Sequence, residues 1–212
     1  MGRQAVYKGL VKPILLSAAG NPENQDRGLV VQDGSRVVLC VADGAGGRSG
    51  GIEAAVMATE YIRQNASLTS DPEMCSELLR RMDDAVTRDA IAGETTCVLT
   101  IITPDEIFGS SVGDSGIWFI PEDTAQVDLS NAQRRKPFLG TGSACAVAFH
   151  HRKQKGSLLL ATDGLLKYTS ADRIIEICRK HPADLAAQHL IESVRYPSGA
   201  LPDDVTVILT EL

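Results

Sequence analysis

The stretch that decides the fold is "CVADGAGGRSGG", residues 40–51, in which an apolar run ends at Asp43 and gives way to a cluster of glycines. A second stretch, "LLLATDGLLKY" (158–168), repeats the pattern with Asp163 followed by a glycine. A carboxylate at the end of an apolar strand is costly to desolvate unless it is paired or binds a cation. The two strand ends therefore need a joint explanation.

Two further aspartates lie at strand edges, since Asp114 follows "SSVG" and Asp203 stands just before "DVTVIL". Each alone is compatible with a turn, as Asp33 is in the turn pair "DG". Four such positions, three of them beside a glycine, favour one shared site.

The residue types at these positions favour a hard, oxygen-binding cation, Mg²⁺ or Mn²⁺ before Zn²⁺. The chain has no Cys-x-x-Cys or His-x-x-x-His pair, which argues against a dedicated zinc site. Gly44 can turn tightly and offer its carbonyl oxygen as a further ligand.

Competing sites for phosphate groups fail on their spacing. "GAGGRSGGIE" lacks the lysine of a Walker loop, and Ser49 stands where G-x-G-x-x-G needs its last glycine. Cys75 and Arg81 have the spacing of cysteine-dependent phosphatases, but they lie in a helical pattern without glycines to form a phosphate cradle. We therefore interpret Cys75 as an ordinary helix residue.

The composition is that of a globular protein, with 43% hydrophobic and 23% charged residues among 212. We expect one domain over residues 1–212, a monomer, and no bilayer-spanning run. Five cysteines without a close pair and a polar N-terminus predict a cytoplasmic protein. A net charge of −6 argues against a nucleic-acid partner. Two basic clusters, "RRK" (134–136) and "HHRKQK" (150–155), are interpreted as solvated loops, with substrate docking as the alternative.

Strand and helix patterns are grouped along the chain, which predicts an α+β fold with largely antiparallel sheets. "GLVVQDGSRVVLCVAD" (28–43) predicts a hairpin with a type I′ turn at Asp33–Gly34. Residues 121–143 are irregular. The other expected strands lie near 95–103, 107–114, 116–120, 144–150, 156–163 and 204–212, and the expected helices near 52–64, 70–91, 171–180 and 182–196.

Six motifs in order resemble the metal-dependent protein serine/threonine phosphatases of the protein phosphatase 2C family, most closely its bacterial members. Each motif is weak alone, but together they span nearly the whole chain. They are "NPENQD" (21–26), "VADGAGG" (41–47), "GETT" (93–96), "VGDSGIWFI" (112–120), "ATDGLL" (161–166) and "PDDVTVI" (202–208).

The resemblance implies a four-layer α-β-β-α sandwich with two central antiparallel sheets and a metal cleft at one end. It assigns the metals to Asp43, Gly44, Asp114, Asp163 and Asp203, with Asp43 bridging two ions and Asp114 joining Asp163 at a third. Asp26 would orient water, so that Asp26, Asp43 and Asp163 form the catalytic set. Asp204 matches a position that is often Asn in the family, which favours Asp203 as the ligand.

The implied activity is hydrolysis of phosphoserine and phosphothreonine through a metal-activated water at a binuclear or trinuclear Mn²⁺ or Mg²⁺ centre. The implied partner is a phosphorylated protein, either a serine/threonine kinase or its target. A catalytically weak relative that binds phosphoproteins as a regulatory module is the alternative. Hydrolysis of a small phosphorylated metabolite is a third possibility.

The chain departs from the family pattern at three positions. Asn21 stands where the family commonly has an arginine that grips the substrate phosphate, and the nearest cations in sequence are Arg27 and Arg48. Gln25 replaces a metal-binding Glu found in some relatives, and Ala45 replaces the histidine of animal-type enzymes. The segment between "GDSG" and "ATDG" is short, which predicts a reduced flap beside the site.

Overall fold

Strand β3 (Arg36–Asp43) is apolar on both faces, and the fold follows from the need to cover both of them. Val38 and Cys40 belong to a core cluster shared with two helices. Leu39 and Val41, which alternate with them along the strand, belong to a second cluster shared with another sheet. The computed structural model describes residues 11–45 and 49–212, so residues 1–10 and 46–48, including Arg48, lie outside it.

Two five-stranded sheets pack face to face, and every strand pair in them is antiparallel. The first sheet has the order β2-β3-β4-β5-β8. Its other strands are β2 (Asp26–Asp33), β4 (Cys97–Ile102), β5 (Glu106–Val112) and β8 (Val147–Arg152). The second sheet has the order β1-β10-β9-β6-β7. Its strands are β1 (Ile14–Ala18), β6 (Gly116–Pro121), β7 (Val127–Asp128), β9 (Gly156–Ala161) and β10 (Val205–Glu211).

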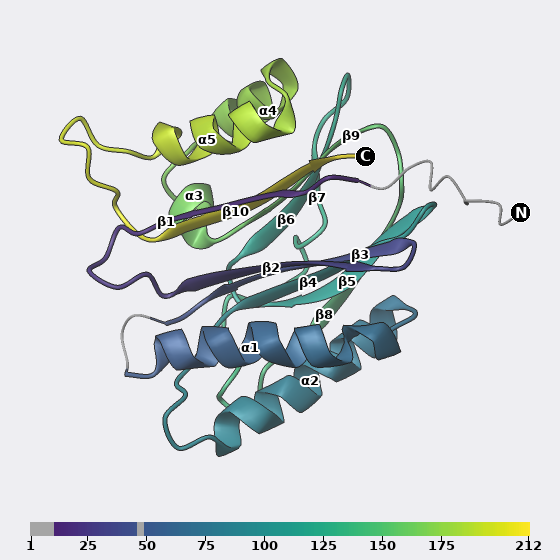
Figure 1. Ribbon diagram of the computed structural model, residues 1–212, viewed down its shortest axis with the longest axis vertical. Helices are drawn as coiled ribbons and strands as arrows, with labels where there is room; N and C mark the ends of the chain where they lie inside the picture. The colour runs from purple at the N-terminus through teal and green to yellow at the C-terminus, as the bar shows by residue number, and fades with distance from the viewer. Residues whose placement is uncertain (1–10, 46–48) are drawn as a thin grey trace, which may run out of the picture.

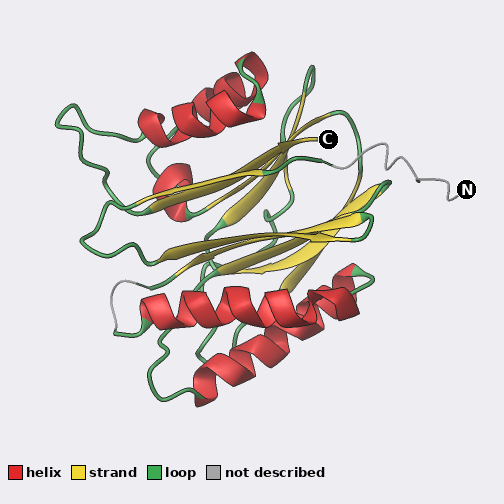
Figure 2. Ribbon diagram, viewed as in Figure 1, coloured by secondary structure: helices red, strands yellow, loops and turns green. Residues whose placement is uncertain are grey.

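Helices cover the outer face of each sheet, which gives the four layers visible in Figures 1 and 2. The first sheet is covered by α1 (Gly51–Asn65) and α2 (Pro72–Arg88), which are joined by a short 3₁₀ turn, η1 (Ala66–Leu68). The second sheet is covered by α4 (Ala171–Lys180) and α5 (Ala183–Ser193), while the single turn α3 (Asp163–Leu166) follows β9. The predicted α+β sandwich with two central antiparallel sheets is confirmed.

Local sequence explains how the two helices under the first sheet begin and pack. The α2 helix starts at Pro72 because Asp71 caps it, its carboxylate accepting a hydrogen bond from the Met74 backbone N–H at 2.8 Å. Helix α1 presents small buried residues to the sheet, Ala54, Ala55 and Ala58. Small side chains let a helix lie close behind the strands that carry the cleft residues.

Several local predictions need correction. The hairpin loop is Gly34–Ser35, and only Gly34 has a positive φ, of 60°, which is the pattern of a type II′ turn, so the type I′ prediction is wrong. The α2 helix ends at Arg88, and the next residue, Asp89, accepts hydrogen bonds through its carboxylate from the backbone N–H groups of Ile91 and Ala92. Residues 150–152 form part of β8, an edge strand whose exposed side chains tolerate charge, and are not a loop.

Four short elements, β1, η1, β7 and α3, were not predicted from the sequence. β1 is a short strand at a sheet edge with an exposed Leu15, and α3 is one turn directly after β9. Neither is long enough for its periodicity to stand out. Within the described residues, no helix has the length and hydrophobicity needed to cross a membrane.

Asp83 of α2 anchors the segment between β7 and β8, and we expect Asp83→Asn to destabilise the fold by about 1–3 kcal/mol. The buried Asp83 carboxylate accepts hydrogen bonds from the backbone N–H groups of Gly140 (2.7 Å), Gly142 (3.1 Å) and Ala144 (2.9 Å). An amide offers one acceptor oxygen and sets its NH₂ against the remaining donors. Urea unfolding of this variant beside Asp84→Asn, at an exposed neighbour, measures the loss. Equal urea midpoints for Asp83→Asn and Asp84→Asn would contradict this expected loss of stability.

Candidate active site

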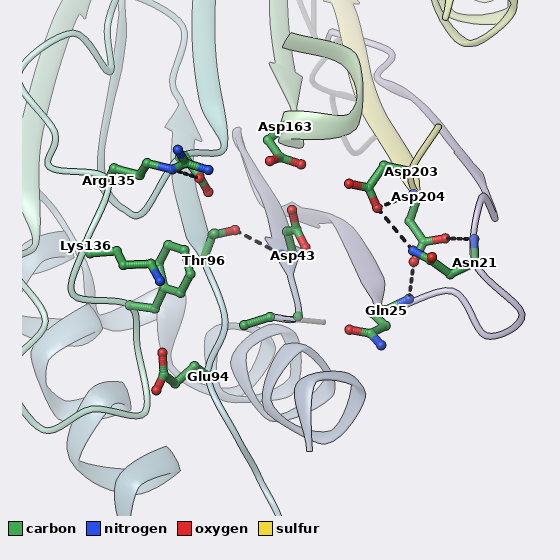
Figure 3. A pocket seen from close by; sticks show the side chains of 14 residues that line it. Asn21, Gln25, Asp43, Glu94, Thr96, Arg135, Lys136, Asp163, Asp203 and Asp204 are labelled. Carbon is green, nitrogen blue, oxygen red and sulfur yellow. Dashed lines mark hydrogen bonds and ion pairs between the residues drawn. The ribbon is translucent and has the colours of Figure 1, made fainter. Parts of the chain in front are cut away.

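A cleft of about 550 Å³ lies where the ends of several strands meet, and it contains the whole predicted metal set. Figure 3 shows Asp43 and Asp163 in the middle of this cleft, with Asp203 and Asp204 on one side. The described lining is Asn21, Gln25, Asp43, Gly44, Ala45, Glu94, Thr96, Asp114, Arg135, Lys136, Phe138, Asp163, Asp203 and Asp204. Asp43 and Asp203, 160 positions apart in the chain, therefore face one space.

Each carboxylate comes from the point where a strand starts or ends. Asp43 is the last residue of β3, and Asp163 is the first residue of α3, after β9 and Thr162. Asp114 lies in the turn between β5 and β6, and Asp203 lies just before β10. Neighbouring antiparallel strands run in opposite directions, so the end of one strand lies beside the start of the next. Aspartates from four separate places in the chain can therefore meet in one cleft.

The backbone of Asp43 is held by the threonines of the "GETT" motif. The Asp43 N–H donates to Thr96 Oγ1 at 3.0 Å, and the Thr96 N–H donates to the Asp43 carbonyl at 2.8 Å. Thr95 Oγ1 donates to the same carbonyl at 2.9 Å, and Thr96 Oγ1 lies 2.6 Å from Ser115 Oγ. The "GETT" motif, which carries no predicted metal ligand, thus fixes the backbone of the central aspartate.

Gly44 is required by the close approach of the following helix. A Cβ at position 44 would lie 2.3 Å from the Gly51 carbonyl oxygen, a distance that backbone atoms do not tolerate. The Gly44 N–H donates to the Gln25 carbonyl at 3.3 Å. The end of β3 therefore packs at Gly44 against both the "NPENQD" loop and the start of α1.

The clustered carboxylates raise one another's pKa values. Burial, together with the nearby Asp26, Asp163, Asp114 and Asp203, raises the pKa of Asp43 to about 9. Burial, joined by Asp114 and Asp203, also raises the pKa of Asp163. Such crowding of negative charge is unfavourable in the bare protein and is relieved by a bound cation.

Asp26 lies behind the cleft rather than on its surface. It is buried, it pairs with Asp43 across the β2–β3 ladder, and it does not belong to the described lining. Its Oδ2 accepts a hydrogen bond from Thr162 Oγ1 at 2.8 Å, and burial raises its pKa to about 7. Its Oδ1 is buried without a hydrogen-bond partner among the described residues.

Asp204 and the adjacent Asp203 make different contacts. The buried Asp204 carboxylate accepts three backbone N–H groups, from Gly20 at 2.8 Å, Asn21 at 3.0 Å and Gln25 at 2.9 Å. It therefore pins the "NPENQD" loop beside the cleft. Asp203 Oδ1 accepts from Asn21 Nδ2 at 3.1 Å and from the Asp204 N–H at 3.0 Å. These bonds engage one oxygen of Asp203, and its Oδ2 can serve as a ligand.

The donor set fits a hard divalent cation. It offers carboxylate and carbonyl oxygens, and the buried Gln25 Oε1 has no hydrogen-bond partner among the described residues. In the described part of the chain, no three Asp, Glu, His or Cys side chains form a ready-made ligand cage. Ions held here would thus keep several water ligands, as Mg²⁺ commonly does in proteins.

The cleft also contains residues that sequence reasoning did not select. Arg135 and Lys136 line it: "RRK" (134–136) is an exposed loop, as interpreted from the sequence, and two of its residues also face the cleft. Arg135 Nε donates to Asp114 Oδ2 at 2.7 Å. The charged cluster itself was the available signal, but the irregular segment around it gave no sign of where it would fold.

Of the two cations nearest to Asn21 in the sequence, Arg27 does not line the cleft. The Nη1 group of Arg27 donates to the carbonyls of Asn24 (2.8 Å) and Asp26 (2.6 Å), and Arg48 lies outside the described residues. Cys75 is buried in α2, where burial raises its pKa to about 12. A thiol with such a pKa is not a nucleophile at neutral pH, as its helical setting predicts.

Comparison with known proteins gives a consistent family. The model of the family described as protein phosphatase 2C matches residues 18–190. Similar solved structures include a bacterial serine phosphatase (TM-score 0.81, 17% identity, 95% of this chain and 98% of that one). Others are the serine/threonine phosphatase Stp1 from Staphylococcus aureus (0.79, 17%, 100% and 99%) and the catalytic domain of PstP in complex with two manganese ions (0.76, 17%, 95% and 97%). None of the curated protein sequences matches significantly.

Proposed function

Because the chain belongs to the protein phosphatase 2C family of phosphoprotein-hydrolysing enzymes, we propose that it removes phosphate from phosphoserine and phosphothreonine in proteins with the aid of two divalent cations, Mn²⁺ or Mg²⁺. The observation that carries the proposal is the convergence of Asp43, Asp114, Asp163 and Asp203 on one cleft. The manganese ions bound by the similar PstP domain support the choice of cation.

We assign the cation ligands to the side chains of Asp43, Asp163 and Asp203 and to the Gly44 carbonyl. Bound divalent cations supply the acidity that makes a water molecule nucleophilic at neutral pH, and they neutralise phosphoryl oxygens. Asp43 would be the ligand common to both ions, because it lies in the middle of the cleft near Asp163 and directly precedes Gly44 in the chain. Asp26, behind Asp43, accepts from Thr162 and serves as a positioning residue with a pKa close to neutrality.

The charge of the described lining supports bound cations. It contains six acidic side chains, Asp43, Glu94, Asp114, Asp163, Asp203 and Asp204, and two basic ones, Arg135 and Lys136. Divalent cations would offset this excess of negative charge. Asp114, the residue that would hold a third ion with Asp163, already has the Arg135 guanidinium as its counter-charge.

Divalent-metal dependence is the first test of the proposal. We expect the purified protein with Mn²⁺ to hydrolyse an aryl phosphate and a phosphothreonine peptide, and to lose at least about 99% of this activity on chelation, because the lost charge stabilisation amounts to several kcal/mol. Restored Mn²⁺ should restore turnover. Asp163→Asn should behave like the chelated protein, whereas Asp105→Asn, at an exposed turn away from the cleft, should behave like wild type.

The outcomes of this test separate the alternatives. Turnover that survives exhaustive chelation would reject a metal-dependent hydrolase. Phosphopeptide binding without turnover would instead support a regulatory module that binds phosphoproteins, the alternative suggested by Asn21 in place of the family arginine. Hydrolysis confined to small phosphorylated metabolites in a substrate panel would replace the protein substrate.

A further inference from the structure

The cleft has an unusual distribution of positive charge for a site that must bind a phosphate dianion. Among its described lining residues only Arg135 and Lys136 are cationic, and both come from the irregular segment between β7 and β8. Figure 3 shows them on the opposite side of Asp43 and Asp163 from Asn21. The arginine expected at position 21 is thus missing, while two cations stand on the facing wall.

Asn21 does not replace the missing guanidinium. Its amide is neutral, and its Nδ2 already donates to Asp203 Oδ1 at 3.1 Å. Arg27 is unavailable because its Nη1 group donates to two backbone carbonyls. A phosphoryl group entering the cleft therefore finds no charged donor on this side among the described residues.

Arg135 has the geometry that phosphate binding needs. Its Nε donates to Asp114 Oδ2 at 2.7 Å, which fixes the orientation of the guanidinium plane. The two Nη groups make no hydrogen bond to the described residues, and the side chain is 72% exposed. A guanidinium with one donor tied down and its outer edge open can bind two phosphoryl oxygens at once.

The segment that carries Arg135 is anchored on both sides. Before it, Gln133 Nε2 donates to the Ser115 carbonyl at 2.6 Å. After it, Phe138 is buried, and Asp83 accepts the backbone N–H groups of Gly140 and Gly142. The cation is therefore held in place before substrate arrives, which lowers the entropic cost of binding.

We propose that Arg135, assisted by Lys136, binds the reacting phosphoryl group from this wall and so takes over the task of the arginine absent at position 21. The inference rests on the proposed phosphatase activity and specifies how that site holds its substrate. It predicts that the phosphate is gripped from the wall formed by the residues between β7 and β8, opposite the "NPENQD" loop.

The test compares Arg135→Ala with Arg134→Ala, an adjacent exposed arginine that does not line the cleft. Loss of a bidentate, charge-assisted contact should raise KM by about tenfold to hundredfold, because hydrogen bonds to charged groups are worth about 1.5–3 kcal/mol. The increase should be similar for p-nitrophenyl phosphate and for a phosphothreonine peptide with neutral flanks. The inhibition constant of inorganic phosphate should rise in parallel, with kcat changing by less than about threefold. Arg134→Ala should match wild type.

Rescue from the other wall gives a second readout. Adding Asn21→Arg to Arg135→Ala should restore KM to within about fivefold of wild type, because a guanidinium again reaches the phosphate. Arg135→Lys should recover only part of the loss, since an ammonium ion does not bind two oxygens in the same plane.

Three results would overturn the inference. An unchanged KM for p-nitrophenyl phosphate with a raised peptide KM would show that Arg135 binds the acidic flank of a substrate. A fall in kcat with constant KM would show that it acts only through Asp114. Equal effects of Arg134→Ala and Arg135→Ala would show a general charge effect. If wild type has no turnover, the proposed function fails, and calorimetric binding of inorganic phosphate with Mn²⁺ present still decides whether Arg135 is the anion ligand.

Discussion

Asp43→Asn is expected to stabilise the metal-free protein and, in the same molecule, to lower kcat by at least about 10³-fold. The stabilising effect arises because burial and four neighbouring carboxylates raise the pKa of Asp43 to about 9, so that its charge is unfavourable in the folded state. An amide of the same shape removes that cost. The catalytic loss arises because the central ligand of the cation pair disappears, and about 4 kcal/mol corresponds to a factor of 10³.

The stabilisation should depend on pH in a defined direction. The unfolded chain releases the Asp43 proton near the ordinary aspartate pKa of 3.8, whereas the folded, metal-free chain retains it until about pH 9. The native state therefore binds more protons between these values, and the wild-type free energy of unfolding falls as the pH rises through this window. The advantage of Asp43→Asn should be largest near pH 8 and should shrink towards pH 5.

Thermal melts with a chelator measure this effect. We expect Asp43→Asn to melt at least about 2–4 °C above wild type at pH 8, the shift that about 1 kcal/mol produces in a chain of this size. Excess Mn²⁺ should raise the melting temperature of wild type and leave that of Asp43→Asn nearly unchanged. Asp105→Asn, at an exposed turn, serves as the control. A variant that melts below wild type without metal would contradict the electrostatic cost assigned to Asp43.

The sequence was most informative where an apolar strand stops. Asp43, Asp114, Asp163 and Asp203 each interrupt or border such a strand, and the structure gathers them in one cleft, although their individual roles remain proposals. Hydrophobic periodicity and desolvation cost are local signals, which is why they can be read before the chain is folded.

Other parts of the site depend on tertiary placement, so the local sequence did not show where they would lie. Arg135 reaches the cleft because an irregular segment is folded back by Asp83, more than fifty positions earlier. Thr96 matters through its contacts with the Asp43 backbone, not through any chemistry of its own. The turn at Gly34 shows the limit at short range, because "DG" correctly indicated a hairpin but led to the wrong type of turn.

The adjacent aspartates before β10 should separate into a stability residue and an activity residue. Asp204→Ala is expected to lower the free energy of unfolding by about 4 kcal/mol, because it deletes a buried acceptor of three backbone N–H groups. The melting temperature should fall by about 8–16 °C. Asp203→Ala loses only its hydrogen bonds to Asn21 Nδ2 and the Asp204 N–H, so its unfolding free energy should change by about 1 kcal/mol or less.

Activity at a temperature where both variants are folded completes the comparison. Asp203→Ala should lose at least about 10²-fold in kcat and need more Mn²⁺ for half-maximal activity, because a cation ligand is gone. Asp204→Asn keeps an acceptor oxygen for part of the loop, so it should fold and retain most of its turnover. The reverse pattern, with Asp203→Ala unfolding and Asp204→Asn losing its metal response, would contradict this assignment. The cation ligand would then be Asp204, and Asp203 would be the residue needed for stability.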